Sequence, residues 1–176
     1  MGINIEIKAK ANEPDRLRRV LENLCASPGE VIFQEDVFFH TLKGRLKLRI
    51  LAPDRGELIY YERDDFVGPK PSNYLIMACA DPNSLKILLS TALGIRGVVK
   101  KQRLLYRIGN ARVHLDDVHG LGFFVEVEVV LSEAQTPEDG EFVAEEIMNK
   151  LGICKTDLIA EAYIDLLKQS AKSGQS

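Results

Sequence analysis

The chain has 176 residues, of which 45% are hydrophobic and 28% are charged, and its formal net charge is −3 at pH 7. This length fits one domain with a sizeable core, and the slightly acidic balance argues against a general nucleic-acid-binding protein, which would carry a basic surface. The sequence has no run of eighteen apolar residues, and Glu6 interrupts the N-terminal apolar residues, so we predict neither a membrane span nor a secretory signal. Three widely spaced cysteines favour a cytoplasmic protein without disulfide bonds.

The first predicted strand, residues 3–10, alternates apolar and polar side chains. Successive side chains of a strand point to opposite faces, so one face of this strand is apolar. The other face carries Asn4, Glu6, Lys8 and Lys10. An acid and two bases side by side would be unusual on a solvated face, but they fit a polar cavity that holds both a metal cation and an anion.

The first half of the chain continues as a helix and then a β-meander. The helix has Pro14 in its first turn and Asn12 as its expected N-cap. Residues 64–71 are rich in glycine and proline and are expected to form a loop before a strand over residues 73–80. The strands of the meander are predicted over residues 31–39, 45–51 and 57–63.

The second half of the chain contains three predicted helices and three predicted strands. One helix begins near Pro82 and ends at Gly94, a second begins at Pro137 and ends at Gly152, and the last covers residues 156–168. The strands are predicted over residues 98–108, 112–118 and 123–131.

Charged residues recur at every second position on several of these strands, for example at Lys101 and Arg103 and at Glu126 and Glu128. On one strand alone this pattern would indicate the solvated face of a sheet. On several strands the apolar faces need helices to cover them, which leaves the charged faces for an interior. We therefore predict an α+β fold in which a closed eight-stranded β-barrel has a polar lumen and helices packed outside. One domain is expected over residues 1–168, followed by a disordered polar tail over residues 169–176.

Five groups of residues, in order along the chain, resemble the motifs of a known family. They are Asn4-x-Glu6-x-Lys8, Gln34-Glu35-Asp36-x-Phe38-Phe39, Arg45-Leu46-Lys47-Leu48-Arg49, Val99-x-Lys101-x-Arg103, and Leu115-Asp116-Asp117-Val118-x-Gly120-Leu121-Gly122 followed by Glu126-x-Glu128. Over residues 3–168 the sequence resembles the CYTH superfamily, or triphosphate tunnel metalloenzymes, and in particular its class IV adenylyl cyclase-like branch. Thiamine triphosphatases and inorganic triphosphatases are other members. Each motif alone is weak evidence, whereas the ordered set is specific.

The resemblance implies that the eight strands form an antiparallel tunnel. It also implies a metal-dependent enzyme that acts on ATP, thiamine triphosphate or tripolyphosphate, as a monomer or a homodimer. Hydrolysis of the phosphoanhydride and cyclisation of ATP both remain open. Lys10 and Arg63 are added to the residues that match the family because alternation along their strands places them on the same face. The expected phosphate-binding residues are then Lys8, Lys10, Lys47, Arg49, Arg63, Lys101, Arg103 and Arg112. Lys8, Arg49 and Lys101 are the expected catalytic residues.

The resemblance also implies that carboxylates of the lumen bind Mg²⁺ or Mn²⁺, which prefer oxygen ligands. The expected metal ligands are Glu6, Asp116, Glu126 and Glu128. The alternative is that these acids only neutralise neighbouring bases. His114 has the same strand parity and is either an acid–base group or, as is more usual for a lone histidine, a hydrogen-bonded structural residue.

Three departures from the family pattern weaken the metal and substrate assignments. Asn4 replaces the first glutamate of the family motif, Tyr61 stands where a lysine is usual, and residues 73–79 are almost without charge. The alternative hypothesis is therefore a non-catalytic nucleotide- or polyphosphate-binding protein with a degenerate metal site.

Overall fold

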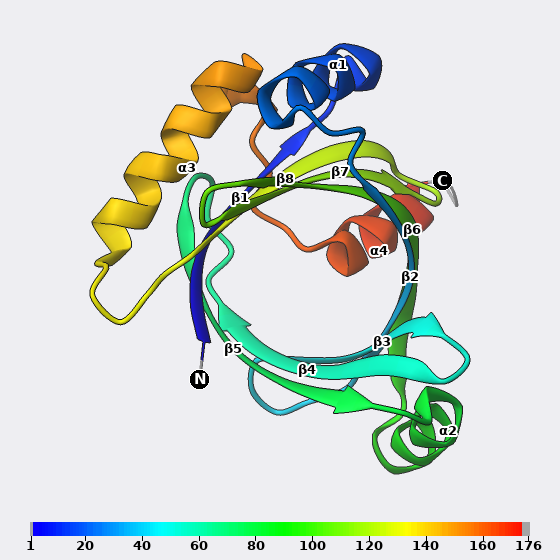
Figure 1. Cartoon of the computed structure of the whole chain (residues 1–176). Coiled ribbons are helices and arrows are strands. Elements are labelled where there is room, and N and C mark those ends of the chain that lie inside the picture. The colour runs from blue at the N-terminus through cyan, green and yellow to red at the C-terminus, as the bar shows by residue number, and fades with distance from the viewer. Residues whose placement is uncertain (1, 174–176) are drawn as a thin grey trace.

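Eight antiparallel strands close into a barrel, and four helices pack outside it (Figure 1). The computed structural model describes residues 2–173. The spatial order of the strands is β1-β5-β4-β3-β2-β6-β7-β8, and pairing of β8 with β1 closes the barrel. The predicted α+β class and closed eight-stranded antiparallel barrel are confirmed. The strands are β1 (Gly2–Lys10), β2 (Glu30–Phe39), β3 (Arg45–Ala52), β4 (Arg55–Arg63), β5 (Lys70–Cys79), β6 (Ile95–Ile108), β7 (Ala111–Val118) and β8 (Gly122–Val130).

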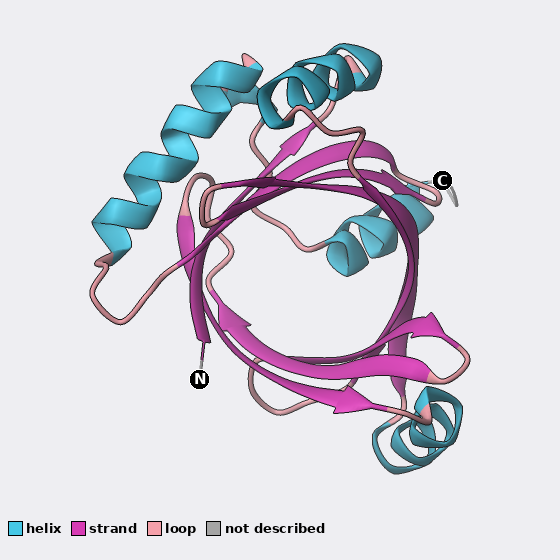
Figure 2. Cartoon of the chain, viewed as in Figure 1, coloured by secondary structure: helices cyan, strands magenta, loops and turns pink. Residues whose placement is uncertain are grey.

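Helices pack around the ring of strands in Figure 2, three of them on its outer side and the last across one end of the barrel. They are α1 (Pro14–Cys25), α2 (Pro82–Leu93), α3 (Pro137–Leu151) and α4 (Tyr163–Ser173). Helices α1 and α3 lie together over β1, β7 and β8, where Ile5, Ile7 and Leu21 are at most 1% exposed. Helix α2 lies on the other side of the barrel and packs on β2, β3 and β4. The helices therefore leave the inner faces of the strands to the polar residues.

Close approach of α3 to the barrel depends on a residue without a side chain. A Cβ atom added to Gly140 would lie 2.6 Å from Cγ1 of Ile5 and 2.7 Å from Cδ2 of Leu131. Such contacts are shorter than packed side chains accept, so glycine allows α3 to sit directly on β1.

The predicted helix over residues 156–168 is wrong in its first half. Residues 155–157 form one 3₁₀ turn, and α4 begins only at Tyr163. Between them, the N–H of Ile159 donates to the carbonyl of Lys8 at 2.8 Å, and Leu158 forms a β-bridge with Ala9. Pairing with the end of β1 therefore replaces the helical hydrogen bonds. Of the predicted disordered tail, residues 169–173 belong to α4, and residues 174–176 lie outside the described part of the chain.

Two further predictions need correction. Lys70 belongs to β5 and not to a loop, because Glu6 of β1 pairs with it. Helix α1 has Glu13 at its N-cap, because the N–H of Leu17 donates to the carbonyl of Glu13 at 3.0 Å, and the side chain of Asn12 donates to Asp157 at 2.9 Å. All three cysteines are free. Within residues 2–173, none of the helices combines the length and the apolar composition needed to cross a membrane.

Candidate functional site

The barrel encloses a cavity of about 650 Å³ that is lined by all eight strands and by the start of α4. Several of its charged side chains are buried, and buried charges act on one another and on a bound ion more strongly than solvated charges do. The bases and acids of the lining are not mixed at random. They form two walls, which are described in turn.

The first wall consists of bases from β3 and β6 arranged around one carboxylate. Asp36 on β2 is 2% exposed and accepts from Lys47 at 3.0 Å and from Arg49 at 2.9 and 3.1 Å. The ammonium of Lys101 lies 4.0 Å from the same carboxylate. Burial by itself would raise the pKa of Asp36, but Arg49, Lys47 and Lys101 hold it well below its usual range. Burial and the nearby Arg49 lower the pKa of Lys47 to about 8, although Asp36 opposes them.

Arg103 joins this wall to the opposite one. Its guanidinium donates to both oxygens of Asp116, at 2.6 and 2.7 Å, and to Oε2 of Glu126 at 2.9 Å. Asp116 is fully buried and also accepts from the hydroxyl of Tyr163 at 3.1 Å. With its oxygens bound in this way, Asp116 fixes the position of Arg103 and lies behind the cavity lining rather than in it.

The second wall consists of acids and a histidine from β1, β7 and β8. Glu6 forms an ion pair with Arg63, and burial raises the pKa of Glu6 because the attraction of Arg63 only partly offsets it. Glu128 binds Arg112 through Oε2 at 2.9 Å. Strand register places Glu126 opposite both Lys8 of β1 and His114 of β7. Acids from neighbouring strands therefore meet at one place on the lumen.

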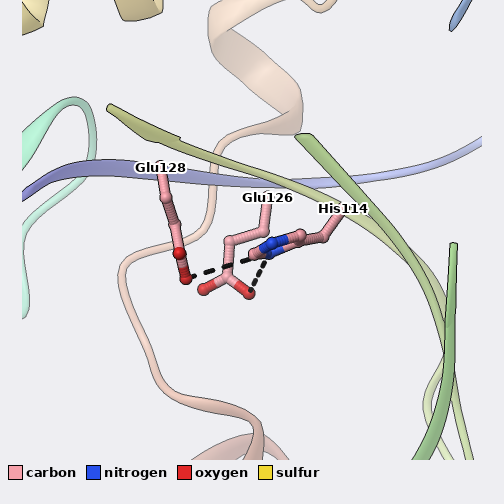
Figure 3. A group of neighbouring side chains, drawn as sticks. All are labelled: His114, Glu126 and Glu128. Carbon is pink, nitrogen blue, oxygen red and sulfur yellow. Dashed lines mark ion pairs between the residues drawn. The ribbon is translucent and has the colours of Figure 1, made fainter. Parts of the chain in front are cut away.

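His114 faces the two glutamates of β8, and Figure 3 shows it on the Glu126 side of the group. Its Nδ1 is 3.9 Å from Oε2 of Glu126 and 3.8 Å from Oε1 of Glu128. Both separations are too long for hydrogen bonds. His114 is 3% exposed, and its Nδ1 has no hydrogen-bond partner. Burial, together with the charge of Arg103, lowers the pKa of His114, so its imidazole is neutral at pH 7.

The start of α4 and the residues before it cover part of one end of the barrel. The ammonium of Lys8 lies 4.2 Å from the ring centroid of Tyr163, and that of Lys101 lies 5.1 Å from it. Lys8 donates to the carbonyl of Glu161 at 3.1 Å, and Lys70 donates to that of Ala160 at 2.8 Å. This end of the cavity is therefore rich in cations that already have backbone acceptors.

The opposite end of the cavity has an apolar rim. Phe38 and Val99 pack against α4, so the other ends of β2 and β6 lie far from it. The apolar lining residues there include Ile32, Phe33, Leu51, Ile76 and Leu105, beside the charged side chains of Glu30 and Arg55. Ile76 is 53% exposed, which shows that this end opens to solvent.

Comparison with known proteins assigns the barrel to a family. The CYTH domain model matches residues 2–163. The chain belongs to the CYTH domain family. A Methanocaldococcus jannaschii protein named "putative adenylate cyclase" is 25% identical over 177 residues, which cover 93% of this chain and 98% of that protein.

Solved structures of archaeal proteins share the same CYTH fold. A Pyrococcus horikoshii OT3 protein has a TM-score of 0.81 and 26% identity, over 93% of this chain and 99% of its own. A conserved hypothetical protein from Pyrococcus furiosus has a TM-score of 0.78 and 22% identity, with the same coverage of both chains. These similarities extend over nearly the whole CYTH domain.

The structure brings most of the sequence-predicted site residues of this CYTH domain to one cavity. The lining contains Glu6, Lys8, Lys47, Arg49, Arg63, Lys101, Arg103, Arg112, Glu126 and Glu128, and also Asn4 and His114. Lys10 is not among the lining residues, because its ammonium donates to the carbonyl of Leu121 at 2.7 Å. Asp116 and Arg63 are held by ion pairs with Arg103 and Glu6.

Three residues of the CYTH site were not predicted from the sequence. Asp36 shares the strand parity of Gln34 and Phe38, so alternation along β2 was sufficient to place it in the lumen. Lys70 was assigned to a loop, and Tyr163 to the middle of a helix. For these two no sequence pattern indicated the lumen, because their positions depend on pairing with β1.

Proposed function

We propose that this CYTH protein is a metal-dependent enzyme that binds a small organic triphosphate in the barrel and hydrolyses or cyclises it. The observation that carries the proposal is one buried cavity with bases on one wall and an acid–histidine cluster on the other. A triphosphate carries several negative charges and needs both features. The name of the Methanocaldococcus jannaschii relative favours a nucleotide as the substrate.

The bases would bind the phosphate oxygens. Arg49 and Arg103 present guanidinium groups, which bind phosphate through paired charge-assisted hydrogen bonds, and Lys8 and Lys101 add point charges. Asp36 and Asp116 fix Arg49 and Arg103 before any ligand arrives. Positive groups that are already oriented stabilise the charge that develops on a reacting phosphate without further rearrangement.

Glu126 and Glu128 would hold the divalent cation. The fit rests on their donor atoms, since these carboxylates share a group with His114 in which all ligand atoms lie within 4.8 Å of one another. When bound, such an ion neutralises charge on the phosphate oxygens. The apolar rim around Ile32 and Leu51 suits the ring system of an organic triphosphate, whereas tripolyphosphate has no group for it.

The proposal is tested by product analysis. The protein is incubated with ATP, thiamine triphosphate or tripolyphosphate and with Mg²⁺ or Mn²⁺, and the products are separated by ion-exchange chromatography. Inorganic phosphate would identify a triphosphatase, and cyclic AMP with pyrophosphate a cyclase. If every substrate binds but is recovered unchanged, the non-catalytic alternative is correct.

Two variants separate substrate binding from metal dependence. Arg49→Ala should weaken tripolyphosphate binding about tenfold or more, since hydrogen bonds to charged groups contribute roughly 1.5–3 kcal/mol. Glu126→Gln should abolish the metal-dependent turnover while largely keeping the affinity for the metal-free anion. Glu138→Gln, at an exposed position of α3, is the control for Glu126→Gln.

A further inference from the structure

The imidazole of His114 has a ring nitrogen without a partner in a position where an isolated polar atom is unfavourable. Its Nδ1 is buried and has no hydrogen-bond partner. A buried polar atom without a partner is unfavourable unless a ligand or another group satisfies it. The nitrogen faces the carboxylates of Glu126 and Glu128 and not an apolar wall (Figure 3).

The separations match those between ligands of one metal ion. Nδ1 lies 3.9 Å from Oε2 of Glu126 and 3.8 Å from Oε1 of Glu128. Two ligand atoms that are each about 2.1 Å from one ion lie roughly 3–4 Å apart, depending on the angle at the metal. A direct histidine–carboxylate hydrogen bond would instead bring the atoms to about 3 Å.

We propose that His114 is a metal ligand and that, with Glu126 and Glu128, it makes the site select a first-row transition-metal ion over Mg²⁺. Neutral imidazole is a good ligand for these ions, whereas Mg²⁺ strongly prefers oxygen ligands and retains its water. A set of one nitrogen and two carboxylate oxygens therefore favours Mn²⁺, Fe²⁺, Co²⁺ or Zn²⁺. The inference rests on the proposed function in that it takes the two glutamates as metal ligands.

Metal binding is measured on the full chain without any triphosphate, so the result does not depend on turnover. Co²⁺ is titrated by its visible absorption spectrum and Mg²⁺ by calorimetry, for the wild type, for His114→Gln and for His119→Gln. His119 is exposed in the turn between β7 and β8, so its variant controls for surface histidines. The glutamine at position 114 keeps a polar side chain of similar length but offers no imidazole nitrogen.

We expect His114→Gln to lose Co²⁺ affinity by at least about tenfold, because even indirect partners of a metal site are worth 10–100-fold. Its Mg²⁺ affinity should change much less, and His119→Gln should behave as the wild type. Unchanged Co²⁺ affinity in His114→Gln, or equal losses for Co²⁺ and Mg²⁺, would overturn the inference. A wild type that binds neither ion would overturn it as well.

A second measurement does not depend on the folding of any variant. The chain has three histidines, so their ring nitrogens can be followed by ¹⁵N NMR in the wild type as Zn²⁺ is added. A change in the ¹⁵N chemical shift of Nδ1 of His114 that is typical of metal ligation supports the inference. An unchanged chemical shift of this nitrogen at saturation overturns it. Metal ligation by His114 without turnover of any triphosphate would reject only the proposed function. Turnover of a triphosphate together with unchanged Co²⁺ affinity in His114→Gln would reject only this inference.

Discussion

Asp36 occupies the place among Lys47, Arg49 and Lys101 that a bound anion would otherwise take. Its carboxylate compensates the buried Lys101 and the half-buried Lys47 and Arg49 in the ligand-free protein. An incoming phosphate must therefore share these bases with Asp36 or displace it. Single residues of the lumen thus contribute to stability and to ligand affinity at the same time.

Asp36→Asn should separate these two contributions. Removing one partner of a buried ion pair costs about 3–5 kcal/mol, so the free energy of unfolding should fall by about that amount. Tripolyphosphate should bind the variant more tightly than the wild type, because the bases lose their internal counter-charge. Denaturant unfolding with and without tripolyphosphate measures both effects, with Asp54→Asn in an exposed turn as control. A variant as stable as the wild type would show that Asp36 does not hold the bases.

Lys47 gives the lumen a dependence on pH. Its pKa in the folded protein is about 8, whereas an unfolded chain keeps the lysine proton to about pH 10.4. As pH rises through about 8, the folded protein loses this charge first, so the affinity for tripolyphosphate should fall. Between about pH 8 and pH 10.4 the free energy of unfolding should rise with pH through this group, because the unfolded chain binds more protons there than the folded protein does.

The matched variant for this prediction is Lys47→Arg, whose side chain stays charged at all these pH values. Calorimetric affinities at several pH values between 7 and about 9.5 should fall more steeply for the wild type than for the variant. Parallel curves would mean that another group, or the ligand itself, causes the change.

At the residue scale, the sequence was sufficient to predict which side chains enter the lumen wherever this depends on alternation along a strand. Alternation along β3 and β6 predicted that Lys47, Arg49 and Lys101 point inward, and the cavity lining contains all three. Alternation could not indicate which acid binds which base. That Asp116 lies behind Arg103 depends on the register between β6 and β7, and a single sequence does not contain this register.

Between elements, the contact of α3 with β1 determines how the outer helices support the site strand. Gly140→Ala should lower the free energy of unfolding by about 1–3 kcal/mol, which is the usual cost of overpacking. Ile5→Ala removes the crowded Cγ1 atom, so it should cost less in the Gly140→Ala background than in the wild type. A double-mutant cycle by chemical denaturation measures the coupling, and purely additive effects would contradict direct contact.

The element that sequence analysis misplaced, residues 156–168, shows where periodicity stops being informative. Its apolar residues recur at helical spacing, yet Leu158 and Ile159 bond to the end of β1. Hydrogen bonds to β1 replace the hydrogen bonds of a helix in this segment. The intrinsic helix propensity of the residues is too weak to oppose them. Helices with their own capping residues were predicted well, as the capping box of Thr136 and Asp139 in α3 illustrates.

For the whole molecule, the excess of bases over acids in the cavity lining predicts stabilisation by a matching anion. Tripolyphosphate at a hundred times its dissociation constant should add about 2.7 kcal/mol to the free energy of unfolding. For a chain of this length that corresponds to a rise in Tm of roughly 5–10 °C. Orthophosphate at equal ionic strength should give a much smaller shift, as should tripolyphosphate with Arg49→Ala. Equal shifts for the two anions would contradict a site built for a chain of phosphates.

Closure of the barrel also determines when the site comes into existence during synthesis. Residues Lys8–Lys10 of β1 pair with β8, whose residues are translated more than a hundred positions later. At a translation rate of about 5–20 residues per second, β8 is synthesised on the order of ten seconds after the N-terminal strand. Lys8 pairs with Glu126, and Glu6 with Glu128, only when β1 and β8 pair and close the barrel. A nascent chain in which β1 and β8 have not paired therefore keeps Glu6 and Lys8 away from β8, even though His114, Glu126 and Glu128 can already meet in the β7–β8 hairpin.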